Sequence, residues 1–247
     1  SETTSDDRAD ARGVRVLGPP RHDRIMAVAA HPDDVESWCA GTLARAIAAG
    51  ADVRLLLVTS GDKGSADPDA DPAAVAALRE AEARAAAARL GLAEVAFLRH
   101  PDGEVEDTRV LRGQIVACIR RWKPEALFTH DPERPWPPYL AHRDHRIVGR
   151  AALDAAYPLA RDPLSFPEHR RDGLPPHVVS EVSLFASAAA DVYVDISAGF
   201  ERKIAARLAH VSQTPDPEAL APSWRKRAAA IGAPARLPLA EAFVVAA

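Results

Sequence analysis

Short apolar runs alternate with longer helical segments over the first 157 residues, and this alternation constrains the fold more than any other feature. Residues 25–30, 53–59, 95–98 and 126–129 form the apolar runs, which have the length of strands. Runs with so few polar interruptions are typical of strands that are buried on both faces. Between them, helices are expected from Val35 to a stop at Gly50, and over 72–90, 109–122 and 144–157. The pattern therefore predicts an α/β fold, with a mostly parallel sheet and helices on both faces.

The two ends of the chain follow this pattern less closely. The first 22 residues are polar with an acidic start, and we expect a disordered N-terminal tail at 1–22. Residues 23–247 are expected to form a single domain. After a loop at 158–176, strands are predicted at 182–185 and 192–196 and a helix at 200–210, which together form a small C-terminal extension.

Composition excludes several classes of partner. The formal net charge is −4 and no basic stripe is visible, so nucleic acid is not an expected partner. No apolar run approaches the roughly 20 residues of a membrane span, and no membrane partner is expected. Two cysteines, Cys39 and Cys118, do not make a disulfide framework, and a cytoplasmic location is predicted.

Several polar residues come directly after the predicted strands. His31, Gly61, Asp102 and His130 each follow one of the four apolar runs. In parallel sheets of this kind, ligands bind at the carboxyl ends of the strands. We therefore expect these residues to gather at one edge of the sheet.

One histidine and two adjacent carboxylates end the first run, and a second cluster, His142-Arg143-Asp144-His145, lies far downstream. His31 and Asp34 are three residues apart across a strand-to-helix turn, which Pro32 stiffens. Together with His145 they would supply two imidazoles and a carboxylate, which is the donor set of a catalytic zinc site with an open position. These three residues are predicted to bind a metal ion.

The remaining polar residues of the two clusters suggest catalytic roles. Asp33 lies beside Asp34 but is expected to point elsewhere, where its carboxylate can take a proton from an attacking water. His142 is predicted to stabilise an oxyanion or to give a proton to a leaving amine, and Asp144 to orient His142. Either Asp33 or His142 can supply the proton to the amine.

Together, the segment AHPDDVE (Ala30–Glu36) and the later HxDH (His142–His145) resemble the PIG-L/LmbE-type deacetylase family. The likeness extends from about Arg24 to Phe243 and includes the segment GTLARAIAAGADVRLLLVTSGDKG (Gly41–Gly64). It implies a Rossmann-like fold and a zinc-dependent hydrolase, for which Fe²⁺ or another divalent metal can serve. It also implies removal of an acetyl group from an N-acetylglucosamine-type substrate, or cleavage of a related amide.

Carried over by position, the resemblance implies the same roles for the two clusters. His31, Asp34 and His145 match the metal ligands, Asp33 the general base, and His142 the imidazole that stabilises the transition state, with Asp144 as its partner. Arg79 and Asp102 match substrate contacts, and Tyr139 lies near enough to the second motif to contact the sugar or the oxyanion. Arg143 replaces a proline that is common in the family. Self-association of the chain is a further expectation.

Three alternatives remain open at this point. A nucleotide-binding oxidoreductase would carry G-x-G-x-x-G after the first strand, where this chain has AHPDD. A non-catalytic metal-binding protein would have no use for Asp33 or His142. An amidase that acts on a larger glycoconjugate or thiol conjugate would differ from a deacetylase in its pocket loops, which the sequence does not resolve.

Overall fold

The structure of the protein is a computed structural model that describes residues 8–9, 14–18, 20–137 and 141–246. In these residues nine strands form one sheet in the order β1-β2-β8-β9-β7-β6-β3-β4-β5. The strands from β5 to β7 are parallel, whereas β9 runs antiparallel to both β7 and β8. The strands are β1 (Arg8–Ala9), β2 (Arg15–Leu17), β3 (Arg24–Ala29), β4 (Asp52–Thr59), β5 (Glu94–His100), β6 (Ala126–His130), β7 (Glu181–Phe185), β8 (Val192–Asp195) and β9 (Ala240–Ala246).

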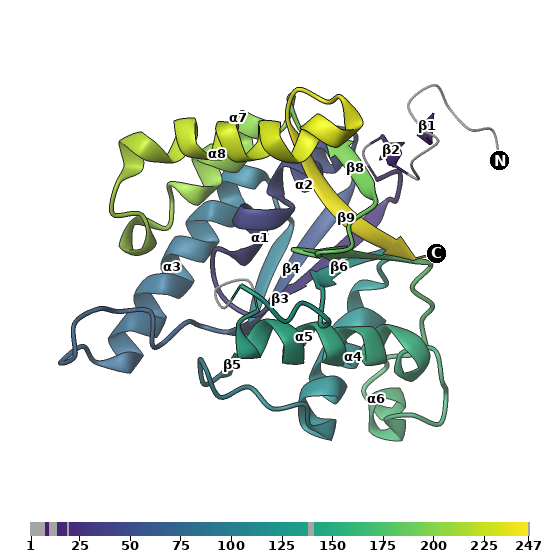
Figure 1. The fold of residues 1–247 in the computed structure, drawn as a ribbon. Helices are drawn as coiled ribbons and strands as arrows, with labels where there is room; N and C mark the ends of the chain where they lie inside the picture. Colours follow the sequence, from purple (N-terminus) through teal and green to yellow (C-terminus); the bar gives the residue numbers. More distant parts are fainter. Residues whose placement is uncertain (1–7, 10–13, 19, 138–140, 247) are drawn as a thin grey trace.

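Burial on both faces explains the apolar sequence of β3. Side chains alternate between the two faces of a strand, and Ile25 and Ala27 join the hydrophobic cluster beneath α1, α2 and α3. Met26 and Val28 point the other way, into the cluster formed with α4 and α5. Figure 1 shows these two groups of helices on opposite sides of the sheet. The predicted Rossmann-like α/β fold with helices on both faces is confirmed.

Local signals set the bounds of the longest helix. The Asp71 side chain accepts a hydrogen bond from the Ala73 amide, Pro72 occupies the first helical position, and Gly91 ends the helix in the left-handed conformation. The helices are α1 (Asp34–Trp38), α2 (Ala40–Ala48), α3 (Pro72–Leu90), α4 (Arg109–Trp122), α5 (Arg143–Asp154), a π-helical turn (Ala155–Leu159), α6 (Pro167–Arg171), α7 (Phe200–Arg207) and α8 (Pro217–Gly232), with 3₁₀ turns at Val211–Gln213 and Ala233–Ala235.

The structure adds detail at both ends of the chain that the sequence did not predict. Residues Arg15–Leu17 fall in the predicted disordered tail but form β2, which pairs in parallel with β8. Without β2, β8 would be an edge strand with unpaired backbone groups, and even a three-residue strand can bond to such groups. At the other end, α8 and β9 were not predicted, and β9 inserts between β7 and β8. The single domain over 23–247 stays a prediction.

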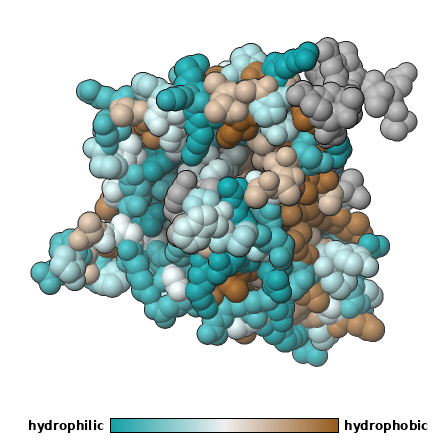
Figure 2. Space-filling model, viewed as in Figure 1, coloured by the Kyte–Doolittle hydropathy of each residue, from teal (hydrophilic) through white to brown (hydrophobic). Residues whose placement is uncertain are grey.

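The described surface is mixed in character. On the face shown in Figure 2, hydrophilic residues cover most of the left and lower parts, and hydrophobic residues gather toward the right. Within the described residues, no helix combines the length and the apolar character that a membrane crossing requires. Cys39 and Cys118 are both buried and free.

Candidate metal centre

A sharp turn after β3 places the first cluster of polar residues at the carboxyl end of the sheet. Asp33 has a φ of 94°, in the left-handed region that non-glycine residues rarely adopt. The Asp34 amide donates to the His31 carbonyl at 3.3 Å, and α1 begins directly at Asp34. As a result, the His31 and Asp34 side chains lie on the same side of the turn, and both are buried.

Helix α5 brings the second cluster to the same place. His142 caps its N-terminus, since the ring Nδ1 accepts a hydrogen bond from the Asp144 amide at 3.2 Å. Gly149 allows the helix to press against β6: a Cβ at this position would lie only 2.4 Å from the His130 carbonyl oxygen. The close approach sets His145, in the first turn of α5, opposite His31.

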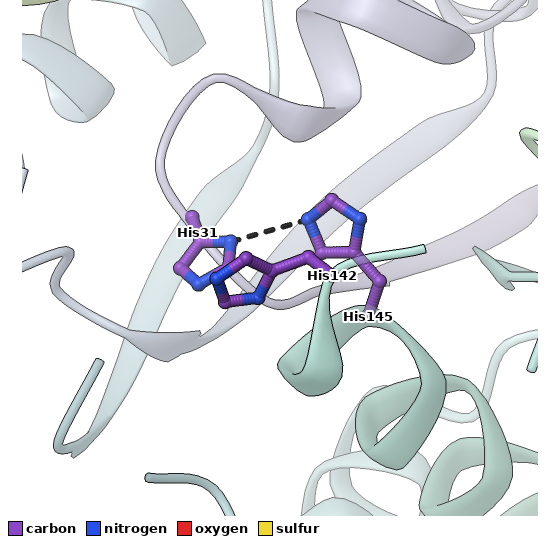
Figure 3. Close-up of side chains that lie close together, drawn as sticks. All are labelled: His31, His142 and His145. Carbon is purple, nitrogen blue, oxygen red and sulfur yellow. Dashed lines mark hydrogen bonds between the residues drawn. The ribbon is translucent and has the colours of Figure 1, made fainter. Parts of the chain in front are cut away.

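The side chains of His31, Asp34 and His145 converge with the spacing of metal ligands (Figure 3 draws His31 and His145, together with His142). His31 Nδ1 lies 3.3 Å from His145 Nε2 and 3.5 Å from Asp34 Oδ2, and His145 Nε2 lies 3.2 Å from Asp34 Oδ1. Two ligands of a tetrahedral zinc ion, each about 2.0–2.1 Å from it, are about 3.4 Å apart. The three separations lie close to this value, with one Asp34 oxygen near each imidazole, and the donor set suits a divalent metal ion.

Two carboxylates hold the other nitrogen of His31. Its Nε2 lies 3.1 Å from Asp102 Oδ1 and 3.3 Å from Asp144 Oδ2. Burial alone would lower the pKa of His31, but these two carboxylates and Asp34 outweigh it and raise the pKa to about 12. With Nε2–H directed at the carboxylates, Nδ1 is the nitrogen that would be available to a metal ion, as in carboxylate–histidine–metal arrangements.

Asp144 was predicted to orient His142, but its carboxylate contacts other groups in the structure. Its carboxylate accepts backbone hydrogen bonds from Gly103 at 2.6 Å and Val105 at 3.3 Å, besides its contact with His31. Its hydrogen bond to His142 comes from the backbone amide. Among the described residues, the carboxylate thus orients His31, and the main chain orients His142.

His130 lies next to His145 and Asp34 at the end of β6 and is almost fully buried. Its ring stacks on that of His145, with centroids 4.1 Å apart, and its Nε2 lies 3.2 Å from Asp34 Oδ2. Burial and the neighbouring His145 lower the pKa of His130 to about 4, so the ring is neutral. Burial alone would raise the pKa of Asp34, but the His145 and His130 rings hold it well below its usual range.

Two arginines flank Asp33. Its carboxylate lies 3.5 Å from Arg207 Nη2 and 3.8 Å from Arg79 Nη2. Arg79 also donates to the carbonyls of Gly61 and Pro32, and only a glycine at 61 leaves room for its guanidinium. Burial raises the pKa of the Asp33 carboxyl, the charge of Asp34 adds to this, and the two arginines act in the opposite direction. Asp33 thus binds a proton more readily than an exposed carboxylate.

The geometry also fixes the proton of His142. Burial, and then the nearby His31 and His145, lower the pKa of His142, which favours the neutral ring at pH 7. Since Nδ1 accepts from the Asp144 amide, the proton of the neutral ring is on Nε2. The rings of His142 and His31 meet edge to face, with centroids 4.8 Å apart. His142 therefore offers one N–H donor beside His31 and His145.

The structure brings most of the predicted site residues together. His31, Asp34, His142, Asp144 and His145 converge, while Tyr139 lies outside the described residues. The remaining three are Asp33, Arg79 and Asp102: Arg79 contacts Asp33, and Asp102 contacts His31. Sequence reasoning gave no role to His130 beyond the pocket edge, and it missed Arg207. The signal for His130 was its position directly after a strand; Arg207 follows from contacts between distant segments and had no local signal.

A profile of the family described as PIG-L, GlcNAc-PI de-N-acetylase, matches residues 26–156. The chain is 32% identical over 200 residues to a diacetylchitobiose deacetylase of Thermococcus kodakarensis, which covers 78% of this chain and 71% of the relative. It is 34% identical over 173 residues to a 1D-myo-inositol 2-acetamido-2-deoxy-alpha-D-glucopyranoside deacetylase of Rhodococcus erythropolis, and covers only 59% of that relative's length.

Among solved structures, the chain is similar to the N,N'-diacetylchitobiose deacetylase of Pyrococcus horikoshii. The TM-score is 0.84 at 27% sequence identity, and the superposition covers 92% of this chain and 84% of the other. Since the family profile ends at residue 156, the likeness in structure extends well beyond the segment that the profile matches.

Proposed function

The chain belongs to the PIG-L family, and on this basis we propose that it is a metal-dependent hydrolase that removes an acetyl group from an N-acetylglucosamine-type substrate. The observation that carries the proposal is the convergence of His31, Asp34 and His145 at 3.2–3.5 Å, beside the partly buried carboxylate of Asp33. The relatives named above act on acetylated amino sugars, and this supports the substrate class.

The metal is held by these three side chains in the proposal. A zinc or ferrous ion supplies Lewis acidity there: it polarises the amide carbonyl and acidifies water. Zinc is favoured by two imidazoles and one carboxylate, and Fe²⁺ accepts the same donor set. Asp102 and Asp144 keep the Nδ1 lone pair of His31 directed at the ion by binding its Nε2–H.

In the proposal, Asp33 is the general base and His142 stabilises the oxyanion. Asp33 accepts the proton of the attacking water, and its raised pKa brings it nearer to the working pH of a general base. His142 donates its Nε2–H to the oxygen on which negative charge develops. Arg79 and Arg207 each contact one oxygen of the Asp33 carboxylate and hold it in place.

Two further aspects belong to the proposal. The buried, free cysteines Cys39 and Cys118 support a reducing compartment, and we propose the cytoplasm. A larger amide is the second candidate substrate, since a mycothiol S-conjugate amidase of Streptomyces coelicolor is 29% identical over 166 residues. A contact of Tyr139 with the sugar or the oxyanion, and self-association of the chain, remain predictions.

A pair of variants tests the assignment of roles. Asp33→Asn is expected to bind zinc like the wild type but to release acetate from N-acetylglucosamine conjugates about 10²–10⁴-fold more slowly. His145→Ala is expected to lose bound zinc, as measured by elemental analysis after gel filtration. An Asp33→Asn variant with wild-type turnover would contradict the role of the base. A His145→Ala variant that keeps stoichiometric zinc would contradict the ligand set.

A further inference from the structure

Arg143 is the first residue of α5 and lies between His142 and Asp144 in the sequence. Its guanidinium contacts the loop that follows β5: Nη1 donates to the Val105 carbonyl at 2.5 Å and lies 3.4 Å from the Gly103 carbonyl oxygen. The Arg143 side chain is 46% exposed, so burial of its charge does not require these contacts. Their effect is instead on the loop, which they tie to the start of α5.

Asp144, the next residue, holds the same loop through its backbone amides. The Asp144 carboxylate accepts from the Gly103 amide at 2.6 Å and from the Val105 amide at 3.3 Å. Arg143 Nη1 also lies 3.5 Å from Asp144 Oδ1, so the two neighbouring side chains contact each other as well as the loop. One side chain thus takes the carbonyls, and the other the amides, of the same two loop residues. Together they form a clamp on this short segment.

The clamped segment directly follows Asp102, which supports His31. Asp102 Oδ1 lies 3.1 Å from His31 Nε2, and the Asp102 side chain is 12% exposed. The Asp102 amide donates to Asp62 Oδ1 at 2.9 Å, which fixes the chain at that residue. The contacts of Arg143 begin one residue later, at Gly103. Loss of these contacts would therefore release the loop on one side of Asp102 and let its carboxylate move relative to the imidazole.

We propose that Arg143 is a positioning residue for the metal centre, because it holds the loop after β5 so that Asp102 stays on His31 Nε2. The group bound to the outer nitrogen of an imidazole ligand sets the orientation of its ring. The charge of Arg143 alone would act in the opposite direction, since a nearby cation repels a bound metal ion. The role rests on the proposed function, in which His31 is a metal ligand, but metal binding can be measured without turnover.

Zinc affinity of three variants tests the role, measured by competition with a chromophoric chelator. Arg143→Met removes every donor of the side chain and is expected to weaken zinc binding about three- to tenfold, less than the loss of an outer carboxylate itself. Arg143→Lys keeps the charge and three N–H donors and should bind within about threefold of the wild type. Arg150→Met, at an exposed arginine of α5 that pairs with Glu133, is the matched control and should bind like the wild type. Unchanged or tighter zinc binding by Arg143→Met would overturn the proposal.

A double variant tests whether Arg143 acts through Asp102. In an Asp102→Asn background the carboxylate that Arg143 positions is already gone, so the further effect of Arg143→Met on zinc affinity should fall to about twofold or less. The same fold loss in both backgrounds would show that Arg143 acts independently of Asp102, and would overturn the positioning role. This coupling also separates positioning from a general loss of structure, which would weaken binding equally in both backgrounds.

Acetate release from N-acetylglucosamine conjugates, measured on the same proteins loaded with zinc, separates this role from the proposed function. With saturating zinc, the kcat of Arg143→Met is expected to fall while that of Arg150→Met stays at the wild-type value. If the wild type releases no acetate but zinc affinity still depends on Arg143 through Asp102, the positioning role stands and the proposed function fails.

Discussion

The two carboxylates on His31 Nε2 give the sharpest prediction for metal affinity. Asp102 Oδ1 and Asp144 Oδ2 lie 3.1 and 3.3 Å from the same nitrogen, and a single N–H cannot be directed fully at both. Loss of such an outer carboxylate typically weakens metal binding about 10–100-fold. Asp102→Asn leaves the Asp144 carboxylate in place, so we expect zinc binding to weaken near the lower end of this range, by about tenfold.

Asp144→Asn is expected to cost more, because its carboxylate also accepts the Gly103 and Val105 amides. A side-chain amide presents one acceptor oxygen in place of two, so one of these contacts is lost. We expect about 100-fold weaker zinc binding and about 1–3 kcal/mol lower stability. Since each carboxylate partly replaces the other, the double variant should lose more affinity than the sum of the two single effects.

Competition against a chromophoric zinc chelator measures these affinities, and urea unfolding of the metal-free proteins measures the stabilities. Asp69→Asn, an exposed carboxylate in the loop before α3, is the matched control and should behave like the wild type. If Asp102→Asn and the double variant bind zinc as tightly as this control, the carboxylates do not support His31 and the reasoning is refuted.

Three further predictions follow from single residues. In metal-free protein the pKa of His31 is raised to about 12 from 6.5, so its stabilising contribution is complete below pH 6.5 and is lost as the pH rises through 12. Zinc must displace the Nδ1 proton at neutral pH, and a pH-stat titration should record about one proton released by His31 per ion, against none if the ring is already neutral. Arg120 is fully buried and donates to five carbonyls between residues 159 and 166. Arg120→Met should therefore lower the free energy of unfolding in urea by about 3–5 kcal/mol. A decrease below about 1 kcal/mol would contradict this role of Arg120. Gly149→Ala would place a Cβ 2.4 Å from the His130 carbonyl oxygen. We expect α5 to move, with about 1–3 kcal/mol lower stability and weaker zinc binding. Wild-type stability and zinc affinity in this variant would show that the helix is not constrained at this position.

The sheet and its covering helices were predictable because their signals are local. An unbroken apolar run predicts a strand buried on both faces, and β3 shows the two alternating contact sets that this requires. The bounds of α3 followed from Pro72 at its start and Gly91 at its end. The position of His31 after a buried strand was sufficient to place it at the carboxyl edge of the sheet.

The C-terminal extension was only partly predictable because its elements depend on distant partners. In α8 only Ala228 and Gly232 are buried, and Pro222 lies inside the helix, so no apolar face is visible in its sequence. β9 is defined by antiparallel pairing with β7 and β8, which lie well before it in the sequence. Strand order of this kind follows from the assembled sheet and has no signature in a seven-residue segment.

The site shows the same division. The two motifs predicted the three candidate metal ligands, but the neighbours that orient these side chains come from other segments. Asp102 follows β5, yet its contact with His31 depends on how the loops after β5 and β3 fold over the edge of the sheet. Arg207 reaches Asp33 from the end of α7 across 174 positions of sequence. These contacts determine which carboxylate supports which imidazole, and that assignment required the structure.

The most direct test of the central claim is a zinc titration of metal-free protein, with acetate release from N-acetylglucosamine conjugates and bound zinc measured on the same samples. The account predicts no release without metal, and a rate that rises with bound zinc up to one ion per chain and then levels off. Acetate release that does not depend on metal, or zinc bound at His31, Asp34 and His145 with no release from any conjugate, would contradict it.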